Sequence, residues 1–382
     1  EKFKRYAKNI EYVSELKDVD DHKIGSFSIE LADTASIEKS RYIQRNIASW
    51  LISKTSNDAL LVSFFAKDQE DWRLSFIQKE TKIKLSTKGK IKIETEITPV
   101  KRFSYFVGKN ELNNTAKQQI FKLVVNKSNN ILSFNEAFSI ENVTKQFYED
   151  YRKLYEQIVY ELQILRKKDE LLKEEFKKKN VNIDTFSKKT LGQIIFLYFL
   201  QKKGWLGVKK VNENQFEKWG TGSKNFLKDL FLEYKSKKTK KQNFFNDILE
   251  PLFYDALNVE RDNHYYEKLD CKIPFLNGGL FEPLNDYSWN TTSILISEEL
   301  TEKIIETFDR YNFTVKEDEP LERDVAVDPE MLGKVFENLL PENLRKGKGS
   351  FYTPREIVQY MCRETLCNYL SDRISNELSK ED

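Results

Sequence analysis

The chain has 382 residues, which is long enough to bury a substantial core and suggests two or three domains. Hydrophobic residues make up 39% and charged residues 32%, a composition typical of a soluble globular protein. The 63 Lys and Arg residues nearly balance the 61 Asp and Glu residues, so the formal net charge is only +2. Overall charge therefore gives no argument for nucleic acid, and any DNA-binding face must be a local patch.

Cysteine usage and hydropathy exclude two further classes. Cys271, Cys362 and Cys367 form no CxxC pair, and with only two histidines the chain offers no plausible zinc constellation. We expect buried, reduced thiols of a cytoplasmic protein. The longest strongly apolar run, 194–200, is far shorter than the roughly 20 residues of a membrane-spanning helix. The sequence thus predicts no membrane span and no signal peptide.

Residues 1 to 126 predict a small mixed α/β domain. Four segments show the alternation or the apolar runs of strands, and one segment has the spacing of a helix. Their order is strand, helix, strand, strand, strand. The segments are 23–31, 43–52, 59–65, 71–77 and 90–97. This order is the layout of many small α/β domains, including nucleases that bind a metal with acidic residues and a lysine on adjacent strands.

A metal-dependent nuclease needs two carboxylates for a divalent ion and usually a lysine. Asp20 or Asp21 followed by Glu30 gives acceptable spacing, but Ala32 stands where the lysine is expected. The run 15–17, Glu-Leu-Lys, offers an acid and a lysine without an upstream acidic partner. We favour a solvated charged surface here and leave a nuclease open. Near 72–76 and 98–108, basic and aromatic residues on strands are interpreted as sheet packing plus a solvated face.

Long helices follow from residue 139. An apolar stripe predicts one helix that runs to about Lys179, and an almost wholly apolar segment, 191–206, predicts a buried helix that ends at Gly204. A further helix is expected around 226–231. The stripe consists of Val143, Phe147, Tyr151, Leu154, Ile158, Leu162 and Leu165.

Two connections come next. The lysine-rich stretch 234–242 is expected to be a loop and is the best local candidate for contact with a DNA backbone, although a plain solubilising loop explains it equally well. The stretch 273–282 has a glycine pair between apolar anchors and predicts a tight, buried connection.

The stretch 342–361 contains a basic Gly-Lys-Gly loop that runs into a Thr-Pro pair. Thr353 is the natural N-cap of a following amphipathic helix, Pro354 suits its first position and Glu356 completes a capping box. By pattern alone this is a well-made helix start that needs no ligand.

The run 349–354, Gly-Ser-Phe-Tyr-Thr-Pro, followed by an apolar helix resembles the motif that opens the methyltransferase domain of gamma-class N6-adenine DNA methyltransferases. Separated segments between about 40 and 370, including 273–282 and 328–340, resemble type IIG-like restriction-modification enzymes in the same order. The resemblance implies that Tyr352, Thr353 and Pro354 touch the methionine end of S-adenosylmethionine, with Ile357 packing behind them.

The resemblance also implies an α+β protein in three parts: an α/β domain over 1–126, nuclease-like or not, a helical connector over 127–320, and the start of a Rossmann-like methyltransferase domain over 321–382. The parent would methylate adenine N6 in double-stranded DNA, and a fused nuclease would use Mg²⁺. The chain contains neither the glycine-rich cofactor turn nor the Asn/Asp-Pro-Pro-Tyr/Phe motif of this chemistry. We therefore assign it no methyl-transfer residue. The alternative is a non-catalytic DNA-binding or scaffold module for a partner subunit.

Overall fold

The computed structural model divides into two compact units, Glu1–Val327 and Asp328–Asp382. Among the helices that the structure describes, none is long and apolar enough to cross a membrane. The described residues are 3, 5–32, 35–79, 82–85, 91–94, 102–109, 111, 113–126, 130–212, 215–237, 242–276, 278–314, 322–329, 331–333, 353 and 355–378.

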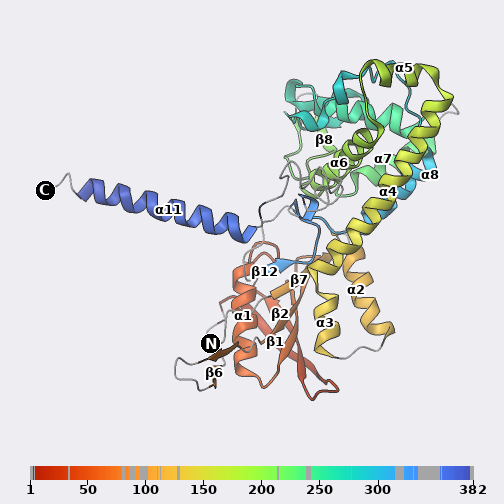
Figure 1. Ribbon diagram of the computed structural model, residues 1–382. Helices are drawn as coiled ribbons and strands as arrows, with labels where there is room; N and C mark the ends of the chain where they lie inside the picture. The colour runs from red at the N-terminus through yellow and green to blue at the C-terminus, as the bar shows by residue number, and fades with distance from the viewer. Residues whose placement is uncertain are drawn as a thin grey trace. The chain divides into compact units, whose positions relative to one another are not determined.

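A six-stranded sheet organises the first part of the chain (Figure 1). Strands β2 and β3 are parallel and are connected through helix α1 (Arg41–Lys54), while the last strand, β12, runs parallel to β7. The other pairs are antiparallel. In spatial order the strands are β1 (Ala7–Lys17), β2 (Lys23–Leu31), β3 (Ala59–Phe65), β4 (Asp71–Gln78), β7 (Arg102–Gly108) and β12 (Glu322–Asp324). Strands β5 (Lys82–Leu85) and β6 (Ile91–Glu94) form a separate hairpin.

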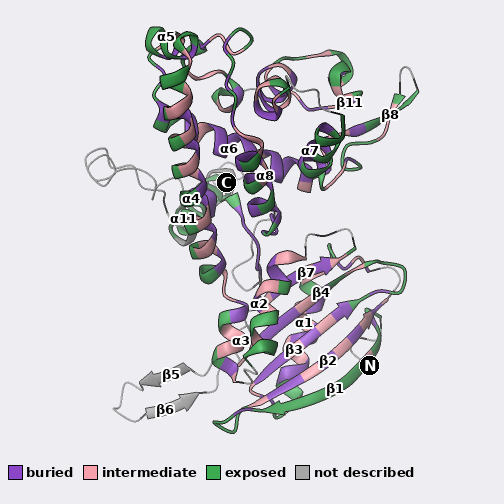
Figure 2. Cartoon of the chain, turned by 90° about the vertical axis from the view of Figure 1, so that its right-hand side faces the viewer, coloured by how far each residue is buried: buried purple, intermediate pink, exposed green. Residues whose placement is uncertain are grey.

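Alternation along the strands explains how the sheet packs. Ile29, Val62 and Phe64 lie on one face and are fully buried together with Ile47 and Leu51 of α1. Figure 2 shows this burial along the middle strands, whereas β1 is exposed along most of its length. The sequence analysis did not predict this edge strand, because β1 is rich in charged residues.

Two short helices, α2 (Asn114–Val125) and α3 (Ile131–Ala137), follow β7. The ring of Phe76 lies 5.6 Å from those of both Phe134 and Phe138, and Tyr105 donates a hydrogen bond to the carbonyl of Ala137. Because Phe76 and Tyr105 occupy strand positions that alternate with the α1 side, α3 covers the opposite face of the sheet.

The remaining helices of the first unit surround α6, which contacts α4 and α7 and is buried on nearly all sides, as predicted. The α-helices are α4 (Ile140–Lys168), α5 (Glu170–Lys178), α6 (Ile183–Lys202), α7 (Phe226–Lys237) and α8 (Glu298–Asp309). Two π-helical turns, η1 (Phe245–Leu249) and η2 (Leu252–Leu257), and four 3-10 turns, η3 (Asp262–His264), η4 (Glu267–Leu269), η5 (Gly279–Phe281) and η6 (Leu284–Asp286), complete the set. A small sheet has the order β10 (Tyr265–Tyr266), β11 (Cys271–Lys272), β8 (Val208–Asn212) and β9 (Gln215–Phe216).

The prediction of one helix from residue 139 to about Lys179 was wrong. The helix ends at Lys168, and the carboxylate of Asp169 accepts hydrogen bonds from the amides of Leu171 (2.9 Å) and Leu172 (3.1 Å) to cap α5. The apolar stripe continues across this break, since Leu172 and Phe176 of α5 are buried. Periodicity therefore located the core face but not the bend.

Three smaller expectations also need correction. Cys271 is buried, but Cys362 and Cys367 are exposed. The stretch expected to be a lysine-rich loop is helical in its first part, because α7 continues to Lys237, and residues 238–241 lie outside the described set. In 273–282 the apolar anchors Ile273 and Phe281 are buried as predicted, whereas the described glycines are exposed.

The α+β fold class is confirmed by this arrangement. The nuclease-like character of the first sheet, the Rossmann-like character of the last segment and the division at 1–126, 127–320 and 321–382 stay predictions. A helix does follow the Thr-Pro pair: α11 spans Arg355–Leu378, drawn in blue in Figure 1.

Candidate functional site

The cofactor motif predicted from the sequence borders α11, since Thr353 precedes the helix and Ile357 lies in its first turn. Thr353 and Ile357 are described and both are exposed, Ile357 to 50%. Tyr352 and Pro354 lie outside the described residues. The side chain of Glu356 is not described either, so the capping box predicted between Thr353 and Glu356 stays a prediction. The first turn of a helix carries backbone N–H groups without intrahelical partners, and these favour an anionic group. Such a helix start suits the carboxylate end of an amino-acid-like ligand.

The apolar residues of α11 are exposed as well. Val358, Met361 and Leu366 have 42%, 58% and 58% of their surface accessible, and Leu370 and Ile374 have 49% and 56%. In a stable globular domain such a helix buries its apolar stripe against other elements. Among the described residues, α11 therefore presents an apolar surface that is exposed.

The chain enters the second unit from an anchored strand. In β12, Glu322 pairs with Arg102 and Asp324 with Ser104 of β7, and the amide of Val325 donates to the Ser104 carbonyl at 2.8 Å. Four residues after Asp324, the carboxylate of Asp328 accepts a hydrogen bond from the amide of Met331 at 2.7 Å. This contact has the form of a helix N-cap, at the start of the predicted helical segment 328–340.

Asp324 is held by buried arginines. Its carboxylate pairs with Arg73 of β4, which has no exposed surface, and with Arg41 of α1 at 3.3 Å. Arg102 of β7, also buried, donates to the side chain of Gln44 at 3.1 Å and to the Arg41 carbonyl at 3.2 Å. We call Arg41, Arg73, Arg102 and Asp324 the arginine cluster.

Electrostatics explains why Asp324 stays ionised in this setting. Burial by itself would raise the pKa of the carboxyl group, but the nearby guanidinium groups of Arg73 and Arg41 outweigh burial and lower it. The same geometry corrects a sequence expectation, because Arg73 is buried in the sheet and is not part of a solvated face. Arg73 and Arg102 stand among alternating apolar residues of strands, which could have indicated that they are buried. Asp324, whose charge both arginines sense, lies some 220 residues or more further along the chain.

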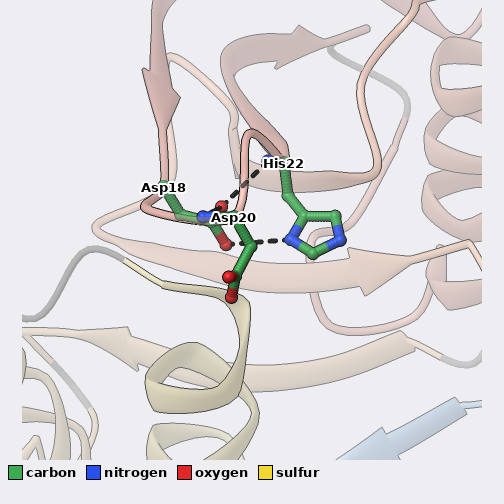
Figure 3. A group of neighbouring side chains, drawn as sticks. All are labelled: Asp18, Asp20 and His22. Atoms are coloured by element: carbon green, nitrogen blue, oxygen red, sulfur yellow. Dashed lines mark hydrogen bonds and ion pairs between the residues drawn. The ribbon is translucent and has the colours of Figure 1, made fainter.

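A second polar group lies at the turn between β1 and β2 (Figure 3). Asp18, Asp20 and His22 place possible metal-ligand atoms within 4.8 Å of one another. The Asp18 carboxylate is nevertheless fully engaged: it accepts from the amides of Asp20 (2.9 Å), His22 (2.8 Å) and Ile131 (3.4 Å) and contacts His22 Nδ1 at 3.2 Å.

These contacts identify a turn-stabilising role. Burial would raise the pKa of Asp18, but hydrogen bonds from the backbone amides of His22, Ile131 and Asp20 more than offset it and lower the pKa. A metal ion would have to displace these donors. The group therefore connects the β1–β2 turn to the start of α3. This structural role explains the presence of Asp18 at this position without a metal ion.

The carboxylates considered for a nuclease are not brought together. Asp21 lies in the β1–β2 turn and pairs with Lys17, whereas Glu30 lies at the far end of β2, opposite Asn9, with Lys8 at 4.0 Å. A strand rises about 3.3 Å per residue, so Asp21 and Glu30 cannot share one ion. Glu15 pairs instead with Lys23 at 3.3 Å. These acids form surface ion pairs.

Comparison with known proteins gives one informative match. The chain is 32% identical, over 188 residues, to a protein of Methanocaldococcus jannaschii whose name describes it as a type II restriction enzyme and methyltransferase. The match covers 46% of this chain and 14% of that relative, so the chain spans only a small part of the relative's length. The similarity to restriction-modification enzymes expected from the sequence is thereby confirmed. No family model matches the chain, and no solved structure matches it.

Proposed function

We propose that this chain is the N-terminal portion of a restriction-modification DNA methyltransferase. The longer protein would transfer a methyl group from S-adenosylmethionine to adenine N6 within a specific site of double-stranded DNA. The observation that carries the proposal is the match to a relative named a restriction enzyme and methyltransferase. The Gly-Ser-Phe-Tyr-Thr-Pro run directly before α11 adds independent support from the sequence.

In this proposal Tyr352, Thr353, Pro354 and Ile357 line the methionine end of the cofactor. The aromatic ring of Tyr352 would pack on the cofactor, and the hydroxyl of Thr353 would hydrogen-bond its amino-acid end. The backbone amides at the start of α11 would favour its carboxylate. When bound, S-adenosylmethionine supplies the methyl group.

The two remaining parts of the chain would then serve the methyltransferase core. The arginine cluster would fix the segment that leads into the core against the first sheet, and the helices of 127–320 would connect the two. The exposed apolar residues of α11 would pack against methyltransferase elements contributed by the longer protein. Methyl transfer itself would use residues outside these 382.

Titration calorimetry with S-adenosylmethionine tests the cofactor site. We expect a form of the protein that continues past Asp382 to bind the cofactor, and Tyr352→Ala to weaken binding by about tenfold, which corresponds to roughly 1.4 kcal/mol. Tyr360→Ala is a matched control, because Tyr360 is a 66% exposed tyrosine of α11. No binding by a folded longer form would return the Thr-Pro stretch to an ordinary helix cap and favour the DNA-binding or scaffold module.

Site-specific DNA cleavage is the second activity that we propose for the longer protein, by analogy with the relative's name. Mg²⁺ is the metal that such a reaction would use. The surface ion pairs of Asp21 and Glu30 lead us to exclude these two residues from its active site.

A further inference from the structure

The small sheet of the first unit carries lysines interleaved with aromatic rings. Its strands are β8 (Val208–Asn212), β9 (Gln215–Phe216), β10 (Tyr265–Tyr266) and β11 (Cys271–Lys272). Helix α6 ends at Lys202, a few residues before β8 begins. We call the connected set of Lys203, Lys210 and Lys272 with the rings of Trp205, Trp219 and Tyr265 the lysine-aromatic face.

Each of the three ammonium groups rests over a ring. Lys203 Nζ lies 4.5 Å from the ring centre of Trp205, Lys210 Nζ lies 4.8 Å from that of Tyr265, and Lys272 Nζ lies 4.4 Å from that of Trp219. Cation–π attraction holds a lysine at such distances while its remaining N–H groups point elsewhere. The charges are therefore positioned, unlike those of freely rotating surface lysines.

Contacts between the rings make the face continuous. The rings of Trp205 and Trp219 are 6.4 Å apart, and Lys272 also lies 5.4 Å from the ring of Phe216, which is 5.6 Å from that of Tyr265. A single path of contacts thus leads from Lys203 through the rings to Lys210. The three lysines belong to one surface.

Glycines build the corner that brings the two tryptophans together. Gly204 ends α6 with a positive φ of 66°, and its carbonyl accepts hydrogen bonds from the amides of Gly220 and Gly222, both at 3.0 Å. A Cβ on Gly222 would lie 2.1 Å from the Leu206 carbonyl oxygen, so the backbones can approach this closely only with glycine. Trp205 directly follows Gly204 in the sequence, and Trp219 directly precedes Gly220.

The positive charges of the face are not neutralised by ion pairs among the described residues. Neighbouring lysines behave differently: Lys202 and Lys224 both pair with Glu111, and Lys235 pairs with Glu302. At the edge of the face, carboxylates are engaged by hydroxyl groups, since Asp270 accepts from Tyr265 at 2.7 Å and Glu217 accepts from Thr221 at 2.8 Å.

We propose that the lysine-aromatic face binds the phosphate backbone of duplex DNA. Three ammonium groups that lie over aromatic rings on one connected surface, without ion pairs among the described residues, complement a polyanion, although the net charge of the chain is only +2. The choice of DNA as the polyanion rests on the proposed function. The location of the contact rests on the geometry alone, and it lies outside the lysine-rich stretch 234–242 singled out from the sequence.

Fluorescence anisotropy with a labelled duplex tests the face in the 382-residue chain across a series of salt concentrations. In the variant Lys203→Gln/Lys210→Gln/Lys272→Gln, we expect the slope of log K against log salt to fall by about 3, because each phosphate contact contributes about 0.9. At low salt this variant should bind the duplex about tenfold or more weakly than the wild type.

Two matched variants serve as controls. Lys167→Gln/Lys168→Gln/Lys177→Gln removes the same charge from exposed positions of α4 and α5 and should retain wild-type binding. Lys203→Arg/Lys210→Arg/Lys272→Arg keeps both the charge and the cation–π contacts, so it should restore the salt slope. Equal circular dichroism spectra of all variants would separate a binding effect from unfolding.

The inference is overturned if the glutamine variant of the face binds like the wild type, if the α4–α5 control loses as much affinity, or if the chain binds no duplex while a longer form methylates DNA. In each of these cases the proposed function stands. That function fails separately, whatever the face does, if a longer form neither binds S-adenosylmethionine nor methylates DNA.

Discussion

Glu250 is a carboxylic acid with no exposed surface in the helical region, between the two π-helical turns. It accepts a hydrogen bond from the hydroxyl of Tyr287, whose oxygen lies 3.3 Å from that of Tyr254. Burial raises the pKa of Glu250 well above its ordinary value of 4.5, and the nearby charge of Asp247 adds to the shift. Burial therefore favours the protonated form of Glu250 in the folded protein.

This protonation makes folding stability depend on pH. The native protein keeps a proton that the unfolded chain releases above pH 4.5, so stability is greatest below that value. Stability falls as pH rises toward the folded pKa, by at most about 1.4 kcal/mol per pH unit. We expect Glu250→Gln to gain stability relative to the wild type as the pH rises above the unfolded pKa of 4.5, measured by urea unfolding at a series of pH values.

Glu299→Gln is the matched control, since Glu299 is exposed on α8 and its substitution should leave the pH profile unchanged. A constant stability difference between the wild type and Glu250→Gln across this range would contradict a buried, protonated carboxyl group.

Single residues were the level least accessible to sequence reasoning. Arg73 was interpreted as part of a solvated face and Glu250 was not singled out, because charged side chains are rarely buried without partners. Their partners, Asp324 and Tyr287, lie far along the chain and become visible only when the fold brings them together. Apolar positions such as Phe147 and Ile158 were predictable, because their burial follows from helical spacing alone.

At the scale of elements, we expect β12 to matter for the stability of the large sheet. This strand joins a sheet whose other members end at Gly108, and Asp324 is its buried polar contact with α1 and β4. Removal of one partner from a buried ion pair leaves uncompensated charge and costs about 3 kcal/mol or more.

We therefore expect Asp324→Asn to lower the free energy of unfolding by about 3 kcal/mol in chemical denaturation. Asp68→Asn, in the exposed turn between β3 and β4, should change it by less than about 0.5 kcal/mol. Equal effects of the two substitutions would show that Asp324 does not anchor the strand.

Three strands of the large sheet could be predicted because their periods are strong. The segments predicted at 23–31, 59–65 and 71–77 correspond to β2, β3 and β4 within one residue at each end. Predictions failed where local chemistry interrupts a period, as at Asp169, and in β1, which is mostly exposed and whose register is shifted twice along its length. Strand β12 is three residues long, which is too short to carry a periodic signal.

At the scale of the whole molecule, the fold was predicted in part and the cofactor site stays a proposal. The beginning of the cofactor motif was identified by its resemblance to a family, since physical pattern alone described only a capped helix. The match covers 14% of the relative's length, and the longer protein that we propose would supply the rest of the methyltransferase. The three-part division at 1–126, 127–320 and 321–382 stays a prediction within that protein.

Methyl transfer to DNA tests the central claim most directly. A form of the protein that continues past Asp382 would be incubated with duplex DNA and S-adenosylmethionine, and the digested nucleosides would be identified by mass spectrometry. The proposal predicts N6-methyladenine, reduced together with cofactor binding in Tyr352→Ala and unchanged in Tyr360→Ala. The absence of any methylated nucleoside, from a folded protein tested on DNA of diverse sequence, would contradict it.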